Sequence, residues 1–153
     1  MDKLSPAARS RVMSAVHGKN TVSELTVRRM LHALGFRYRL HRKDLPGKPD
    51  IVLPRYLTCI FVHGCFWHQH SGCKRASQPS SNIDFWSQKL RRNTERDKQN
   101  YEKLDVLGWN ICVIWECETK DLQVLKQRLV QYFKSVDQEF YLGARSKPAT
   151  RIS

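Results

Sequence analysis

The chain is organised around the stretch Val62-His63-Gly64-Cys65-Phe66-Trp67-His68-Gln69-His70-Ser71-Gly72-Cys73, which places three His, two Cys and an aromatic pair within twelve residues. An apolar core does not need this composition. The stretch follows the apolar run 57–62, which is typical of a buried strand, so its side chains are expected to emerge where that strand ends. Because binding sites are commonly built at such positions, we interpret the stretch as the candidate functional face.

The length and charge of the chain predict one domain with a polyanionic partner. Its 153 residues are enough to bury a single core. The 27 Lys and Arg against 14 Asp and Glu give a net charge of +13, which favours nucleic acid or an anionic membrane surface. Nucleic acid is preferred, because the sequence has no apolar run near about 18 residues and no secretory signal at its start. We therefore expect a cytoplasmic protein without a membrane partner.

The cysteines indicate metal binding rather than disulfides. The chain has five of them, an odd number, and a cytoplasmic chain with Cys close to His is typical of a metal site. Cys59 and Cys112 lie within apolar runs and are interpreted as packing residues.

The remaining thiols predict a structural zinc site. Zinc takes about four nitrogen or sulfur ligands in a tetrahedron, and a closed site of this kind is structural. Cys65, His70 and Cys73 supply three ligands, and Cys117, at the end of the predicted core strand 109–117, is well placed as the fourth. The alternative is a set of scattered thiols and a surface His.

Two histidines then remain for chemistry, His63 and His68. Asp50 stands at the start of the apolar strand 51–53, and a hairpin about the turn at 54–56 would bring it near the end of the next strand, where His63 emerges. A carboxylate suits magnesium, and a His near neutrality can accept a proton from water. Together they indicate a phosphodiesterase, although each His alone has a structural role as its alternative.

The hydrophobic periodicity predicts an α/β fold with a small mixed central sheet flanked by helices. Glu24 has capping-box spacing from Thr21, and from the sequence alone a capping role is preferred to a catalytic one. The expected order is helix, three strands, helix, strand and helix, over residues 22–34, 36–40, 51–53, 57–62, 85–107 (one kinked helix or two), 109–117 and 120–134. We assign residues 1–20 to a basic N-terminal arm, 21–135 to the domain and 136–153 to a flexible tail.

Aromatic residues beside the ligands predict contact with bases. If the ligands hold the loop at the surface, Phe66 and Trp67 should project outward and stack on bases or insert between them. Trp86, after the polar loop 74–82, is a third candidate. A core position is preferred for three other aromatics, namely Phe85, Trp109 and Trp115.

Several segments between residues 9 and 117 closely resemble the very-short-patch repair endonucleases, bacterial enzymes that nick DNA at T·G mismatches left by deamination of 5-methylcytosine. The segments are Leu45-Pro46-Gly47-Lys48-Pro49-Asp50, Phe61-Val62-His63-Gly64-Cys65-Phe66-Trp67-His68, Phe85-Trp86, Asn93-Thr94-Glu95-Arg96-Asp97, Leu107-Gly108-Trp109 and Val113-Ile114-Trp115-Glu116-Cys117. The resemblance implies a restriction-endonuclease-like fold with a structural zinc site.

The resemblance also implies roles for the candidate catalytic residues. Asp50 and the backbone carbonyl of Val62 would bind Mg²⁺, where the family commonly has a Thr in place of this Val. His68 would activate water and His63 would assist at the phosphate. Glu24 matches an active-site residue of the family, which reverses the preference for a capping role alone.

The remaining family positions concern zinc and DNA. The matching residues are Cys65, His70, Cys73 and Cys117 as ligands of Zn²⁺, Phe66, Trp67 and Trp86 as wedges beside the mismatch, and Met13 in an arm that closes over the minor groove. A wobble pair stacks poorly, so opening that step is easier than at a Watson-Crick pair, which favours the mismatch.

We therefore expect a magnesium-dependent mismatch endonuclease that nicks double-stranded DNA on the 5′ side of the T in a T·G mismatch. It would act as a monomer in the bacterial cytoplasm, associated with the nucleoid, together with mismatch-repair proteins. One alternative is a restriction-type endonuclease that cuts undamaged sites. Another is a zinc-stabilised DNA-binding module without catalysis.

Overall fold

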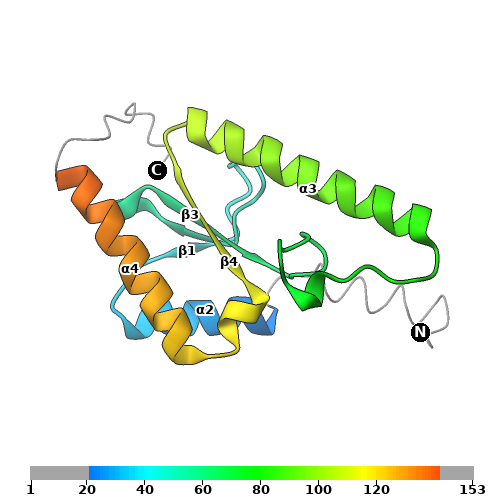
Figure 1. Cartoon of the computed structure of the whole chain (residues 1–153). Coiled ribbons are helices and arrows are strands. Elements are labelled where there is room, and N and C mark those ends of the chain that lie inside the picture. The colour runs from blue at the N-terminus through cyan, green and yellow to red at the C-terminus, as the bar shows by residue number, and fades with distance from the viewer. Residues whose placement is uncertain (1–20, 142–153) are drawn as a thin grey trace.

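The computed structural model describes residues 21–141, with side chains as far as Asp137 (Figure 1). The elements are α2 (Val22–Ala33), β1 (Arg39–Leu40), β2 (Ile51–Leu53), η1 (Pro54–Tyr56), β3 (Thr58–His63), η2 (Lys74–Ala76), α3 (Ile83–Val106), β4 (Asn110–Trp115), η3 (Glu116–Thr119) and α4 (Leu122–Tyr141), where η marks a 3-10 helix. The predicted order of helices and strands is confirmed. The predicted arm with Met13 lies outside the described residues. Within 21–141, no helix is both long and apolar enough to cross a bilayer.

The four strands form a mixed sheet in the order β1-β2-β3-β4. β2 pairs with β1 and with β3 in antiparallel fashion, while β3 and β4 run parallel. The predicted hairpin about η1 is confirmed, because Ile51 pairs with Ile60 and Leu53 with Thr58. β3 takes part in the two longest pairings, with β2 and with β4, and five of its six residues are buried.

The sheet lies between α2 and α4 on one face and α3 on the other (Figure 1). Alternate strand residues point to opposite faces. The core under α2 and α4 is built from Val27, Leu31, Ile51, Leu53, Ile60, Cys112, Ile114, Leu125, Leu129 and Phe133. The core under α3 contains Leu45, Val52, Cys59, Phe61, Leu104 and Trp109. The packing roles predicted for Cys59 and Cys112 are therefore confirmed.

Several elements differ in extent from the sequence prediction. Of the two alternatives for residues 85–107, one kinked helix or two, the structure has one helix, α3, of 24 residues. Its polar stretch stays helical because residues such as Asn93 are buried and bond to the loop after β3. β1 contains only two residues, although Phe36 and Tyr38 still pack against the core. α4 continues to Tyr141, past the end predicted at Lys134.

Candidate active site and metal centre

Asp50 lies beside the end of β3, as the hairpin predicts. It directly precedes β2, and its Oδ2 accepts a hydrogen bond of 2.8 Å from the backbone N–H of Val62. This bond continues the contact between β2 and β3 beyond Ile51, with the Asp50 side chain in place of a backbone group. The carboxylate is thereby placed at the same sheet edge as His63, the last residue of β3.

Glu24 faces this site rather than its own helix terminus. The Thr21 hydroxyl accepts the Glu24 N–H at 3.2 Å, so half of the capping box forms. The Glu24 carboxylate instead contacts His41 Nε2 at 3.0 and 3.1 Å, and its side chain is 4% exposed. One ligand atom from each of Glu24, His41 and Asp50 lies within 4.8 Å of the others.

His41 is a further residue of this site, and it is not among the residues predicted from the sequence. It sits in the left-handed region with φ of +49°, and its backbone N–H donates to the carbonyl of Asp50 at 3.1 Å. It thus links Glu24 to Asp50 through both its backbone and its ring. The available signal was a single His directly after the predicted strand, within a run of basic residues that suggested only a charged surface.

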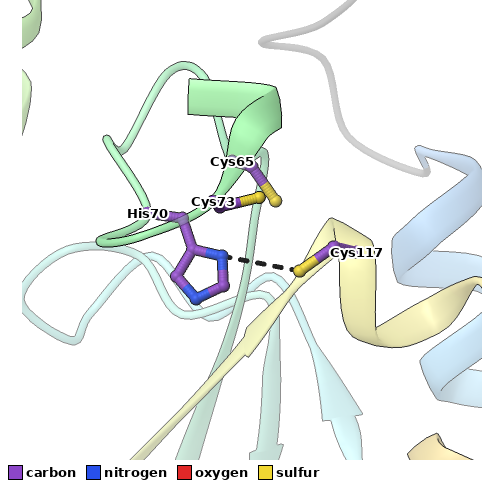
Figure 2. Close-up of side chains that lie close together, drawn as sticks. All are labelled: Cys65, His70, Cys73 and Cys117. Atoms are coloured by element: carbon purple, nitrogen blue, oxygen red, sulfur yellow. Dashed lines mark hydrogen bonds between the residues drawn. The ribbon is translucent and has the colours of Figure 1, made fainter. Parts of the chain in front are cut away.

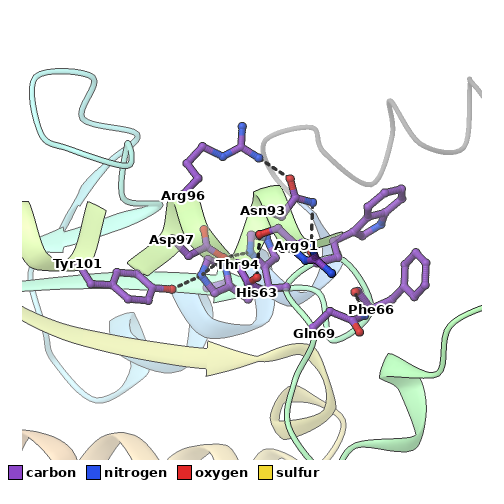
Figure 3. A network of polar contacts seen from close by, with 12 residues as sticks. His63, Phe66, Gln69, Arg91, Asn93, Thr94, Arg96, Asp97 and Tyr101 are labelled. Carbon is purple, nitrogen blue, oxygen red and sulfur yellow. Dashed lines mark hydrogen bonds and ion pairs between the residues drawn. The ribbon is translucent and has the colours of Figure 1, made fainter. Parts of the chain in front are cut away.

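The two imidazoles assigned to chemistry lie face to face. The rings of His63 and His68 are 3.6 Å apart with an interplanar angle of 11°. His68 Nδ1 is 2.5 Å from a carboxylate oxygen of Asp97. His63 Nε2 is 2.5 Å from the hydroxyl of Tyr101 (Figure 3). Each imidazole is therefore hydrogen-bonded to a different side chain of α3, and the Asp97 carboxylate also lies 4.0 Å from His63 Nε2, beyond hydrogen-bond distance.

One face of α3 supports the active-site loop through residues spaced four apart. Asn93 donates to the backbone carbonyl of Trp67 at 3.2 Å, and Asp97 and Tyr101 contact the two imidazoles. Residues four apart lie on one face of a helix. Neither Asp97 nor Tyr101 is among the site residues predicted from the sequence. The sequence shows only that this part of the helix is polar, a pattern that is interpreted as a break in the helix.

Burial changes the protonation of two site residues. It raises the pKa of Asp50 from its usual 3.8 to about 6, an effect that the neighbouring charge of Glu24 strengthens. It lowers the pKa of His63 to about 3, so this imidazole is neutral at physiological pH. The site therefore holds a carboxylate that is destabilised when ionised and an imidazole that does not carry a positive charge.

The four residues predicted to bind zinc come together (Figure 2). One ligand atom from each of Cys65, His70, Cys73 and Cys117 lies within 4.8 Å of the others. Cys65 is fully buried, and His70 Nδ1 is 3.4 Å from Cys117 Sγ. The backbone N–H of Arg75 lowers the pKa of the Cys73 thiol, which favours the thiolate that a metal requires.

The local backbone explains how the loop reaches this geometry. The His70 N–H donates to the Cys65 carbonyl at 2.9 Å, which brings two of the four residues into one turn. His70 stacks on Trp115 at 4.2 Å, and Cys117 follows in η3 rather than within the strand. Gln69 has φ of +51°, and its amide donates to the carbonyl of Phe66, a structural role.

The aromatics do not project outward as the sequence predicts. Trp67 and Trp86 are only 7% and 6% exposed and pack on Leu90, with Phe66 half-buried beside them. Burying two indoles against each other removes a large apolar area from water, which accounts for the difference. The core position predicted for Phe85 is also wrong, since it is 53% exposed.

Replacing Asp50 with Asn should stabilise the protein at neutral pH when no magnesium is added. The pKa of Asp50 is higher in the folded protein than its usual 3.8. The contribution of Asp50 to the free energy of unfolding is therefore greatest below about pH 4, and it is lost as the pH rises through about 6. Asn keeps an acceptor for the Val62 N–H without the buried charge. We expect a gain of about 1–3 kcal/mol at pH 7.5 in urea unfolding, on the scale of 1.36 kcal/mol per pKa unit. The gain should vanish near pH 4, and equal stability at pH 7.5 would contradict the interpretation.

Proteins of known family match most of this sequence. The signature described as "DNA mismatch endonuclease Vsr" matches residues 1–75. The type II nicking enzyme V.XorIIP of Xanthomonas oryzae pv. oryzae is 49% identical over 84% of this chain and 93% of the relative. The type II nicking enzyme V.NmeAIP of Neisseria meningitidis is 43% identical over 88% and 96%. The DNA mismatch endonuclease Vsr of Escherichia coli is 36% identical over 78% and 76%. This chain therefore belongs to the Vsr family and is a DNA endonuclease of that type.

Proposed function

We propose that this endonuclease depends on magnesium and nicks double-stranded DNA on the 5′ side of the T in a T·G mismatch. The observation that carries the proposal is the meeting of Asp50 with the stacked His63 and His68 at the carboxyl end of β3. This site combines an oxygen ligand with a proton acceptor, as hydrolysis of a phosphodiester requires. The surrounding α/β structure is proposed to be a restriction-endonuclease-like fold.

Asp50 and the Val62 carbonyl are the proposed magnesium ligands, with Glu24 beside them. The residues fit a hard cation, because a buried carboxylate, Glu24, and a half-buried one, Asp50, share the site and ionised Asp50 is destabilised there. Magnesium bound at this position would polarise the phosphate and neutralise charge that develops on it. His41 would keep Glu24 directed toward Asp50.

His68 is the proposed general base. Its Nδ1 is engaged by Asp97, which leaves Nε2 as the nitrogen that can take a proton from water. The water oxygen then bonds to phosphorus as its proton moves to Nε2, and the bond from phosphorus to the leaving sugar oxygen breaks. Asp97 would orient the ring and stabilise the imidazolium that forms. His63 would assist at the phosphate.

Zinc is the proposed structural metal. Three thiols and one imidazole match the tetrahedral preference of this ion, and all four groups already lie together. The ligands Cys65, His70 and Cys73 come from the loop after β3, and Cys117 comes from η3. Zinc would therefore fix that loop to the end of β4.

DNA is the proposed partner of the aromatic cluster Phe66, Trp67 and Trp86. The cluster is largely closed in the free protein, so contact with the mismatch requires these rings to leave their mutual packing. The weaker stacking of a wobble pair would offset part of that loss. The net charge of +13 favours the phosphate backbone, and the arm at 1–20 with Met13 is proposed to close over the minor groove.

Nicking of a T·G duplex should exceed nicking of the matched T·A and C·G duplexes by at least about tenfold, since those pairs resist opening. Rates would be measured on end-labelled strands with and without magnesium. Equal cutting of the matched duplexes would favour a restriction-type enzyme. No cleavage of any duplex would favour a binding module. Asp50→Ala serves as the catalytic control, and it should retain DNA binding while nicking is lost.

Replacing Asp97 with Asn should lower the single-turnover nicking rate by about 10²–10⁴-fold, the range for loss of acid–base catalysis. Asn at this position removes the anion that holds His68, and DNA affinity should change little. Glu102→Gln removes one exposed negative charge from the same helix and is the matched control. An Asp97→Asn rate equal to that of the control would exclude the proposed role.

Replacing Cys117 with Ser should lower both zinc content and thermal stability. One thiolate ligand is lost, and structural zinc contributes directly to folding. Metal analysis and thermal unfolding check this expectation. Cys112→Ala removes a different buried thiol and should keep its zinc. Full zinc content in Cys117→Ser would refute the assignment.

A further inference from the structure

Tyr101 contacts the active site but has no role in the chemistry described above. It lies one helical turn beyond Asp97 on α3, and its hydroxyl oxygen is 2.5 Å from His63 Nε2. Its ring packs edge-on against Phe61, with centroids 5.3 Å apart. The core under α3 therefore fixes the ring, and the ring fixes where the hydroxyl points.

The direction of this hydrogen bond determines the tautomer of His63. A phenol has one proton, and within residues 21–141 the only hydrogen-bond partner of the Tyr101 hydroxyl is His63 Nε2. If the imidazole donated instead, the phenol proton would have no acceptor among the described residues, at a half-buried hydroxyl that lies against the buried His63 ring. Burial also raises the pKa of Tyr101, so the hydroxyl keeps its proton. The arrangement that satisfies both groups has Tyr101 donating to Nε2.

The two stacked imidazoles are consequently held through opposite nitrogens. His68 is hydrogen-bonded at Nδ1 to the carboxylate of Asp97. His63 is hydrogen-bonded at Nε2 to the hydroxyl of Tyr101 (Figure 3). A neutral imidazole has one donor and one acceptor nitrogen. With Nε2 of His63 acting as acceptor, its proton resides on Nδ1, which has no hydrogen-bond partner among the described residues.

We propose that Tyr101 is a positioning residue that fixes His63 as the Nδ1–H tautomer and thereby restricts it to donating a hydrogen bond to the scissile phosphate. His68 is then the imidazole that accepts the proton from water. The division of labour between two adjacent histidines is set by their partners on α3, one anionic and one neutral. This inference rests on the proposed phosphodiester hydrolysis for the phosphate contact, whereas the tautomer itself does not depend on it.

The tautomer can be read directly by ¹⁵N NMR of the histidine side chains in the full-length protein without DNA. We expect His63 to carry its proton on Nδ1 and to show an unprotonated Nε2. In Tyr101→Phe, the resonances of His63 should move toward a mixture of tautomers, because the fixed donor is gone. A wild-type His63 protonated on Nε2 would overturn the proposal, as would an unchanged tautomer in the variant.

Single-turnover nicking of a T·G duplex tests the catalytic consequence. Tyr101→Phe should lower the rate at saturating enzyme by about tenfold, the effect of one hydrogen bond, with unchanged DNA affinity. Tyr56→Phe is the matched control, since its ring packs on Phe36 and Phe133 and its hydroxyl makes no hydrogen bond within residues 21–141. A Tyr101→Phe rate equal to that of the control would overturn the positioning role.

Failure of this inference is distinguishable from failure of the proposed function. A wild-type protein that does not nick the T·G duplex would remove the hydrolysis and the phosphate contact, whereas the NMR measurement would still decide the tautomer. A wild-type protein that nicks the duplex, together with an Nε2–H tautomer of His63, would leave the hydrolysis intact and overturn only the role of Tyr101.

Discussion

The parallel pairing of β3 with β4 determines where the rest of the site lies. In that register His63 is opposite Trp115, so both strands end at the same edge of the sheet. β2 starts at this edge because it runs antiparallel to β3, and Asp50 therefore arrives there as well. Cys117 lies in η3, two residues after the end of β4. The strand pairings therefore bring these segments to one edge of the sheet, and the bond from the Val62 N–H to the Asp50 carboxylate adds to them.

α3 then holds this edge from the other side. Its contacts to the loop are spaced one turn apart, with Asn93 on the Trp67 carbonyl, Asp97 on His68 and Tyr101 on His63. The same helix buries Leu90 and Leu104 in apolar clusters on either side of these polar residues. Because apolar packing fixes the helix, its polar face presents partners to the imidazoles without rearrangement. Such fixed partners are what general acid–base chemistry requires.

The sequence could predict the features that depend on short-range pairing. The hairpin that brings Asp50 to Val62 follows from a tight turn between two apolar strands, and three of the four clustered thiol and imidazole groups lie within nine residues. Asp97 and Tyr101 escaped notice because a polar helix face normally faces solvent, and only the tertiary structure shows that this one faces the site. His41 was obscured by its basic neighbours.

The aromatics show a different limit of sequence reasoning. Beside charged ligands, Trp67 and Trp86 suggest exposed rings, yet in the free protein the two indoles bury each other. Phe85 is exposed in their place, although a Phe next to a Trp at a helix start suggests a core. The sequence pattern predicts a cluster of aromatic residues, but it does not predict which of the rings are buried. Their burial depends on packing against Leu90.

The order of residues along the loop would couple the proposed DNA contact to the proposed chemistry. Between Cys65 and His70 the chain carries Phe66, Trp67 and His68, so the aromatic pair and the proposed base lie between a thiol and an imidazole of the candidate metal site. The carbonyl of Trp67 and the ring of His68 are held by neighbouring turns of α3. A movement of Trp67 that breaks the bond to Asn93 therefore acts one residue from the bond between His68 and Asp97. If the aromatic ring and the proposed base were on separate elements, one could move without the other. Here Trp67 and His68 are adjacent in one short backbone segment, so a displacement of the ring is expected to displace the base as well.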